Sequence, residues 1–259
     1  MIKAVFFDVD NTLYSWKTRR FVPSGIEAVK ALQKKGVKVF LCSARPYHSL
    51  KQFGLFDLGI HWNGWVANSG GVAYSRGKFV QKILLDNSLV HDFLRFTKEQ
   101  GCMVQVITPL LRYYNEEPNA YFAEYAKVFT EPFAPVVPFH SKQVVDFLLF
   151  APKEKEDAFR SAFPTLNFFR FHDYAMDVTP VMYSKGEGIR KVLEAYDIDR
   201  NEALGFGDDE PDIGMKEGLD HFCAMGNALE KVKKEAEHIT DMIDEDGLYH
   251  GLRHYGLLD

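Results

Sequence analysis

The chain has 259 residues, enough for one large domain or two small ones, each with its own core. Hydrophobic residues make up 46% and charged residues 26%, which excludes a disordered, collagen-like or coiled-coil chain. The net charge of −5 shows that the chain as a whole is not basic, so we expect no nucleic-acid partner. Three cysteines without a CxxC pair argue against disulfides and a cysteine zinc site. Because no apolar run approaches the roughly 18 residues of a membrane span, and the N-terminus lacks the features of a signal peptide, we expect a cytoplasmic protein without a membrane partner.

The first segment predicts a strand–helix–strand unit. Residues 1–8 contain a continuous apolar run, which is typical of a parallel strand covered on both faces. Ser24 and Glu27 have the spacing of a capping box, so we expect a helix that begins at Ser24 and ends near Gly36. A second strand is expected over residues 37–41. This order predicts a right-handed βαβ unit.

The C-terminal third repeats this pattern. Ser184 and Glu187 predict another capping box at the start of a helix. Short apolar runs then predict strands over residues 203–207 and 222–225, and a helix is expected over residues 228–237.

The middle of the chain has a different character. A hairpin is predicted within residues 72–85, and aromatic side chains recur from Tyr113 to Phe133. The further predicted elements are helices over residues 90–99 and 154–163 and strands over 103–108 and 144–150. We therefore predict a Rossmann-like, doubly wound parallel α/β core from residues 1–83 and 183–259, with an inserted α+β unit at 84–182.

Polar side chains gather where three predicted strands end. They are Asp8, Asp10 and Thr12 after the first strand, Ser43 and Arg45 after the second, and Asp208, Asp209 and Asp212 after the strand over 203–207. Ligands bind outside the carboxyl ends of strands in open parallel sheets. We therefore expect these groups to converge on one site with Lys185, from the first turn of a helix.

Such a site has the composition needed for phosphoryl transfer. Clustered carboxylates repel one another unless a cation lies among them, and Mg²⁺ suits oxygen ligands and a substrate phosphate. Lysine binds phosphate as a point charge. We expect Asp8 to act as the nucleophile that forms an aspartyl-phosphate, and Asp10 to act as general acid and base.

These residues resemble the motifs of the haloacid dehalogenase-like (HAD) phosphatases. The segment from Asp8 to Leu13 is similar to their first motif, DxDxT, and Ser43 and Lys185 correspond to the second and third motifs. The fourth motif is matched by residues 207–212. Two further segments, Asn68-Ser69-Gly70-Gly71 and Met225-Gly226-Asn227-Ala228, resemble the Cof-type branch, whose inserted unit is a mobile class IIB α+β cap.

The resemblance implies Mg²⁺-dependent hydrolysis of small phosphate monoesters, often sugar phosphates. The implied roles are Asp8 as nucleophile, Asp10 as general acid/base, Ser43 and Lys185 as phosphate-binding residues, and Asp8, Asp10 and Asp208 as metal ligands. Asp212 and Asp209 are candidates for a further ligand or for support of the ligands, and Arg45, Asn68 and Asn227 are candidate substrate contacts. The sequence departs from the family at Pro211, where an asparagine is usual, and at Ser43-Ala44-Arg45, where the branch has threonine-glycine-arginine.

Several alternatives stay open at this point. Arg45 either touches substrate or pairs with an acid, and Asn227 either lines the site or caps a helix. The enzyme could instead be a phosphosugar mutase of the same superfamily. The proline at position 211 also leaves open a weakly active sugar-phosphate-binding protein. We expect a monomer or small homo-oligomer that acts on a small phosphorylated metabolite.

Overall fold

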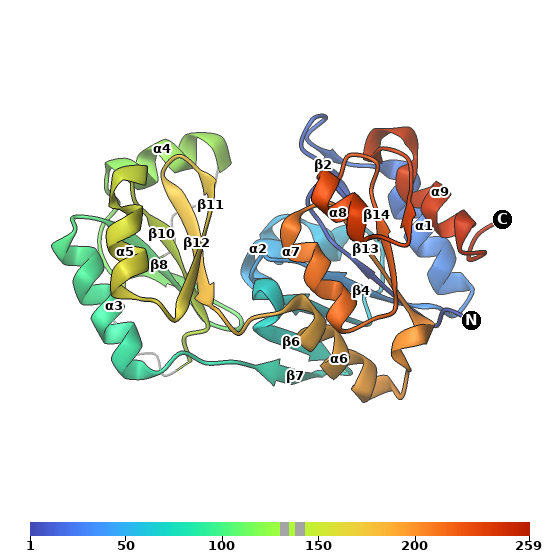
Figure 1. Ribbon diagram of the computed structural model, residues 1–259, viewed down its shortest axis with the longest axis horizontal. Helices are drawn as coiled ribbons and strands as arrows, with labels where there is room; N and C mark the ends of the chain where they lie inside the picture. Colours follow the sequence, from blue (N-terminus) through green and yellow to red (C-terminus); the bar gives the residue numbers. More distant parts are fainter. Residues whose placement is uncertain (130–134, 138–142) are drawn as a thin grey trace. The chain divides into compact units, whose positions relative to one another are not determined.

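The computed structural model describes residues 1–129, 135–137 and 143–259, so Phe133 lies outside the described residues. The chain forms two compact units (Figure 1). The core unit comprises Met1–Lys82 and Ser184–Asp259, and the inserted unit comprises Ile83–Tyr183. Each junction lies one residue from the boundary expected from the sequence.

An eight-stranded sheet forms the centre of the core unit. In sheet order its strands are β15 (His238–Ile239), β14 (His221–Ala224), β13 (Ala203–Gly207), β1 (Ala4–Phe7), β4 (Lys38–Cys42), β5 (Gly64–Ala67), β6 (Val72–Ser75) and β7 (Lys78–Lys82). Neighbours pair in parallel from β15 to β5, and β6 and β7 add an antiparallel hairpin. From β1 the chain continues through β4 and β5 on one side of β1, and later through β13 and β14 on its other side. The direction in which strands are added to the sheet therefore reverses between β1 and β13. The predicted doubly wound fold is confirmed.

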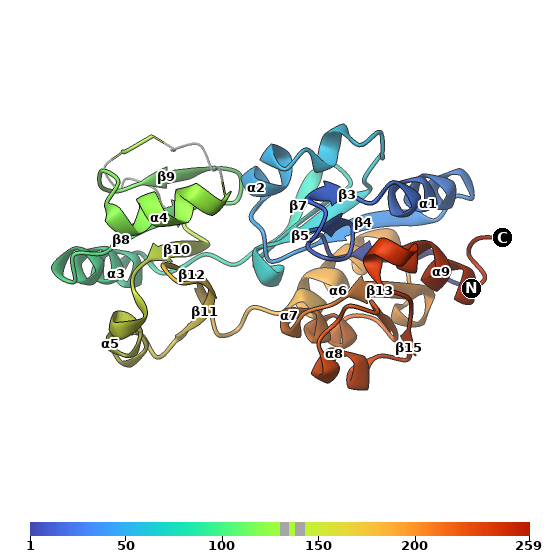
Figure 2. The same cartoon turned by 90° about the horizontal axis from the view of Figure 1, so that it is seen from above.

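Helices cover both faces of this sheet (Figure 2). The helices of the core unit are α1 (Pro23–Lys34), α2 (Tyr47–Gln52), α6 (Lys185–Tyr196), α7 (Glu210–Ile213), α8 (Glu230–Glu235) and α9 (Gly247–His254). On one face, Ile189 of α6 and Val232 of α8 join a buried cluster with Phe6 and Phe40 of the sheet. On the other side, α1 and α9 contact each other. A small hairpin, β2 (Tyr14–Ser15) and β3 (Arg20–Phe21), follows β1.

The two predicted capping boxes have different outcomes. Helix α1 begins at Pro23 with Val22 as its N-cap, so Ser24 lies inside the first turn and does not cap it. Proline favours the first helical position because its fixed φ is helical and its missing N–H would have no partner there. At α6 the N-cap is Ser184, as expected, and its Oγ accepts the Gly186 N–H at 3.1 Å. Glu187 forms an ion pair with Arg190 instead of closing the predicted capping box.

The inserted unit contains an antiparallel sheet between helices. Its strands, in sheet order, are β11 (Leu166–His172), β12 (Ala175–Pro180), β10 (Asp146–Phe150), β8 (Met103–Ile107) and β9 (Arg112–Tyr114). Its helices are α3 (Asn87–Glu99), α4 (Ala120–Phe129) and α5 (Glu156–Ala162). Phe93 of α3 stacks on Phe147 at 4.4 Å between centroids, and α5 joins the same core. Helix α4 packs Tyr125 against Phe150 at 5.1 Å.

One tyrosine holds the two ends of the inserted unit together. The Tyr183 hydroxyl lies 2.5 Å from the carbonyl oxygen of Val145 and 2.9 Å from that of Ile83. Ile83 is the first residue of this unit and Tyr183 the last.

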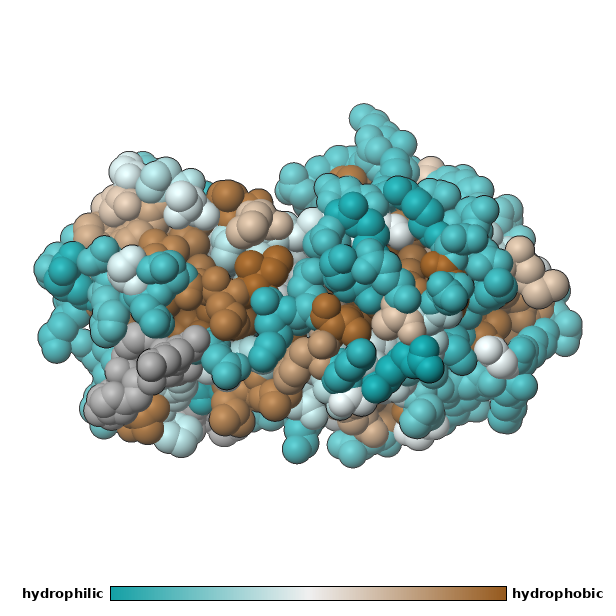
Figure 3. Space-filling view, turned by 90° about the horizontal axis from the view of Figure 1, so that it is seen from below, coloured by the Kyte–Doolittle hydropathy of each residue, from teal (hydrophilic) through white to brown (hydrophobic). Residues whose placement is uncertain are grey.

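Part of the surface of the inserted unit is apolar. Large exposed hydrophobic side chains include Leu111, Phe169 and Phe171, and hydrophobic residues gather on the face of this unit seen in Figure 3. None of the described helices has both the length and the apolar character needed to cross a membrane.

Candidate active site

Three buried carboxylates meet at the carboxyl ends of β1 and β13. Asp8 follows β1, and its N–H donates to the Phe206 carbonyl oxygen of β13 at 3.0 Å. Asp208 follows β13, and Asp212 lies in α7. Carboxylate oxygens of these three aspartates lie within 4.8 Å of one another. The cluster is therefore at the position where the sheet reverses its order, the usual ligand site of this architecture.

Lys185 places a cation against this cluster from the start of α6. Its Nζ donates to Asp8 Oδ1 at 2.8 Å and to the Cys42 carbonyl oxygen at 3.1 Å, and it also pairs with Asp212 Oδ1. The lysine is 3% exposed. The structure thus brings together residues that are 177 positions apart in the chain.

The charges at this site strongly affect one another. Burial and the nearby Asp212 raise the pKa of Asp8 well above its usual value, although Lys185 opposes the shift. Burial and the charges of Asp8 and Asp212 raise the pKa of Asp208 to about 9. Burial alone would lower the pKa of Lys185, but Asp212 and Asp8 raise it well above its usual value. A further cation would relieve the remaining repulsion, and carboxylate oxygens are the ligands that Mg²⁺ prefers.

Asp212 supports the loop that carries Asp208. Its Oδ2 accepts the backbone N–H groups of Asp208 at 2.9 Å and Asp209 at 3.0 Å. Gly207 makes this possible, because a Cβ there would lie 2.5 Å from the Asp212 Cβ. Asp212 therefore positions both the loop and Lys185.

Asp10 does not belong to this group of three carboxylates and is held by two other side chains. Arg45 donates its Nε to Asp10 Oδ2 at 2.7 Å and its Nη2 to Oδ1 at 2.8 Å. The Trp16 indole also donates to Oδ1, at 2.7 Å. Burial would raise the pKa of Asp10, but the Arg45 charge and these hydrogen bonds lower it overall. Among the described residues, the cluster of possible metal ligands contains Asp8, Asp208 and Asp212 without Asp10.

Two further predicted residues lie at the same edge of the sheet. Ser43 follows β4, is buried, and accepts the Arg45 N–H on its Oγ at 3.1 Å. Asn68 follows β5, is buried, and donates its backbone N–H to the Arg45 carbonyl oxygen at 3.2 Å. Arg45 pairs with Asp10, which is one of the two roles expected for it.

Asn227 links loops of the core unit. Its Nδ2 donates to the Asn11 carbonyl oxygen at 3.0 Å, and its Oδ1 accepts the Ile243 N–H at 2.9 Å. Helix α8 begins at Glu230 with Leu229 as its N-cap, so the expectation that Asn227 caps this helix is wrong. The amide is engaged in holding the loop after β14.

Asp209 and Pro211 shape the start of α7. The Asp209 Oδ1 accepts the Glu210 N–H at 2.7 Å, so this side chain caps the helix. Pro211 lies in the first turn, where a missing N–H costs little because first-turn donors have no partner within the helix.

Two residues important to this geometry were missed by the sequence reasoning. Trp16 reaches Asp10 from the loop of the β2–β3 hairpin, and strands of two residues show no detectable periodicity. Gly70 has a φ of +98°, and a Cβ there would lie 1.9 Å from the Ser184 carbonyl oxygen. The family resemblance points to the Asn68-Ser69-Gly70-Gly71 segment, but the need for glycine at position 70 follows from its contact with the start of α6, which depends on the fold.

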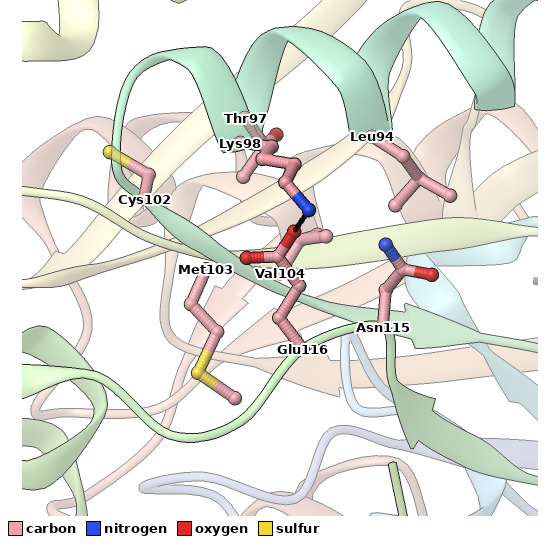
Figure 4. A pocket seen from close by; sticks show the side chains of 8 residues that line it. All are labelled: Leu94, Thr97, Lys98, Cys102, Met103, Val104, Asn115 and Glu116. Carbon is pink, nitrogen blue, oxygen red and sulfur yellow. Dashed lines mark ion pairs between the residues drawn. The ribbon is translucent and has the colours of Figure 1, made fainter. Parts of the chain in front are cut away.

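A separate hollow in the inserted unit is too small for a metabolite. Leu94, Thr97, Lys98, Cys102, Met103, Val104, Asn115 and Glu116 line it (Figure 4). Its space of about 10 Å³ corresponds to roughly one water molecule. Lys98 and Glu116 form an ion pair at 3.2 Å beside it.

The chain matches the family model of haloacid dehalogenase-like hydrolases over residues 5–252. It is 29% identical over 264 residues to the "Putative phosphatase YkrA" of Bacillus subtilis, an alignment covering 99% of this chain and 98% of that protein. A solved protein of Geobacillus kaustophilus has a TM-score of 0.92 at 29% identity, with both chains covered completely. The HAD subclass IIB sugar phosphatase BT4131 has a TM-score of 0.82 at 28% identity, with 99% and 100% of the two chains covered. The chain therefore belongs to the haloacid dehalogenase-like hydrolase family, within which it is a phosphatase.

Proposed function

We propose that the protein is a Mg²⁺-dependent phosphatase that hydrolyses small phosphate monoesters, sugar phosphates among them, in the cytoplasm. The observation that carries this proposal is the buried contact of Asp8 with Lys185 beside Asp208 and Asp212. The similarity to a solved sugar phosphatase supports the substrate class, and three free cysteines agree with a reducing compartment. We infer further that the inserted unit is the class IIB cap of this family.

The first half of the reaction transfers the phosphoryl group to Asp8. An Asp8 carboxylate oxygen attacks phosphorus, and the bond from phosphorus to the leaving oxygen breaks. Asp10 gives that oxygen a proton, so the alcohol leaves neutral. Lys185 and the Ser43 hydroxyl bind the phosphoryl oxygens. Asp8 and Asp208, with the nearby Asp212, would hold Mg²⁺, which would supply positive charge to offset the phosphate.

The second half returns the enzyme to its starting state. Asp10, now ionised, takes a proton from water, whose oxygen attacks the phosphorus of the aspartyl-phosphate. The acyl phosphate bond breaks, inorganic phosphate leaves, and the Asp8 carboxylate is restored. The lowered pKa of Asp10 agrees with the base role in this half. Its acid role requires prior uptake of one proton.

Substitution of the nucleophile tests the mechanism. We expect Asp8→Asn to abolish phosphate release without unfolding the protein, because the amide cannot form the phosphoenzyme. Asp197→Asn is the matched control, since Asp197 is exposed at the far end of α6 with a φ of +58° that asparagine accepts. Full activity of Asp8→Asn in a sample free of contaminating phosphatase would disprove the assignment.

A screen of phosphorylated metabolites tests the substrate class and the metal. Each compound is assayed for phosphate release with Mg²⁺, with EDTA, and with Mg²⁺ restored. We expect sugar phosphates among the best substrates, loss of activity in EDTA and recovery with Mg²⁺. Metal-independent turnover would overturn the metal proposal, and dependence on a bisphosphorylated activator would indicate a mutase.

A further inference from the structure

The Asp10 carboxylate accepts hydrogen bonds from two side chains, Trp16 and Arg45, and both of its oxygens are engaged. Oδ1 accepts from Trp16 Nε1 at 2.7 Å and from Arg45 Nη2 at 2.8 Å, whereas Oδ2 accepts from Arg45 Nε at 2.7 Å. An indole nitrogen donates only and cannot accept a proton. An oxygen that faces it is therefore a poor position for the proton that is passed to a substrate.

Trp16 is itself held firmly in place. Its ring lies edge-on to Tyr14 at 5.3 Å and near Phe53 at 6.2 Å between centroids. Phe21 of β3 contacts both of these rings, at 5.2 Å and 5.6 Å. We call Tyr14, Trp16, Phe21 and Phe53 the aromatic cluster. The Arg45 guanidinium lies over Phe53 at 4.3 Å, so the same cluster also supports the second partner of Asp10.

We propose that Trp16 is a positioning residue for the acid–base chemistry of Asp10. Its N–H anchors Oδ1 and thereby leaves Oδ2 as the oxygen that carries the proton. For the acid step, Oδ2 exchanges its hydrogen bond from Arg45 Nε for one to the leaving oxygen, while the bond from Trp16 to Oδ1 stays. The Oδ2 proton passes to the leaving oxygen as its bond to phosphorus breaks. This inference rests on the proposed phosphatase mechanism and adds a residue to it.

The test compares two leaving groups in Trp16→Phe, which keeps a ring in the cluster and removes the N–H donor. The substrates are p-nitrophenyl phosphate, whose leaving group needs little protonation, and the alkyl phosphate hydrolysed fastest in the screen. The value of kcat/KM reports the first phosphoryl transfer. We expect it to fall about tenfold for the alkyl phosphate, the effect of one hydrogen bond to a charged group, and by less than about threefold for p-nitrophenyl phosphate.

Tyr14→Phe is the control, because it preserves the cluster and the bond from Trp16 to Asp10. It should leave the ratio of the two kcat/KM values unchanged. An equal fall for both substrates in Trp16→Phe, or no fall, overturns the positioning role. Failure of the proposed function looks different, because the wild-type protein then hydrolyses neither substrate.

A second measurement, which does not use the Trp16 variant, covers the case in which Trp16→Phe does not fold. The chain has three tryptophans, so a ¹⁵N-labelled sample gives three indole N–H resonances. Asp10→Asn weakens the charge-assisted bond and should shift one of them strongly upfield in the proton dimension. If all three resonances stay in place, the hydrogen bond is absent and the proposal fails.

Discussion

At the scale of single residues, Lys185 is the side chain on which the acidic cluster depends. It is buried against Asp8 and Asp212, and removal of one partner from a buried ion pair leaves uncompensated charge. We expect Lys185→Met to abolish activity and to lower the free energy of unfolding by about 3–5 kcal/mol without divalent metal. Urea unfolding measures this loss. Lys191→Met is the control, because Lys191 forms a surface ion pair on the same helix, and it should change stability by less than about 1 kcal/mol. Equal losses of stability in the two variants would show that the buried ion pairs of Lys185 are not the cause.

Glu156 makes a pH-dependent contribution in the inserted unit. Burial would raise its pKa, but hydrogen bonds from Arg170 and Arg160 lower it below the ordinary value of 4.5. A carboxyl whose pKa is lower in the folded state stabilises the fold above its unfolded pKa, and this contribution is lost as the pH falls through the folded pKa. Glu156→Gln should therefore cost about 1 kcal/mol at pH 7 and progressively less below about pH 4.

Thermal unfolding of the wild-type protein and of Glu156→Gln, measured from pH 3 to pH 7, gives this difference in stability. Glu154→Gln is the control, since Glu154 is exposed beside the same helix. A destabilisation of Glu156→Gln that is constant from pH 3 to pH 7 would show that its charge is not the cause.

At the scale of elements, the start of α6 is fixed by its close contact with the loop after β5. Gly70 has both a positive φ and no space for a Cβ beside Ser184, whereas Gly77 has a φ of +79° and nothing within 4 Å. Gly77→Ala should cost about 1 kcal/mol from backbone strain alone. Gly70→Ala should cost about 1–3 kcal/mol more, because the helix must move, and activity should fall as Lys185 is displaced. Equal stability and activity of the two variants would refute this role.

The strand ends of the core unit can be predicted from the sequence because apolar runs end there in polar loops. The parallel topology then brings Asp8, Asp208 and Lys185 together. The capping prediction failed at Ser24, since Pro23 takes the first helical position. Contacts such as Trp16 with Asp10 depend on a hairpin conformation that neither residue type specifies.

At the scale of the whole molecule, the inserted unit is a continuous segment with a core of its own. Its buried cluster extends from Leu85 to Val178 and contains only residues of this unit. We expect an expressed segment of residues 83–183 to unfold cooperatively, as single domains of this size do. Circular dichroism and urea titration measure this. Tyr183→Phe in that segment should lower its stability by about 1 kcal/mol, and a segment without a cooperative transition would show that its core is incomplete.

The hydrogen bonds of Tyr183 have a consequence for the evolution of this architecture. Because the first and last residues of the inserted unit are in contact, the whole unit is topologically equivalent to a long loop between β7 and α6. Recombination can exchange such a segment for another with neighbouring ends, without a change in the connections among β1, β4 and β13. The acidic cluster is then inherited separately from the insertion, and the two parts of the gene are free to diverge at different rates.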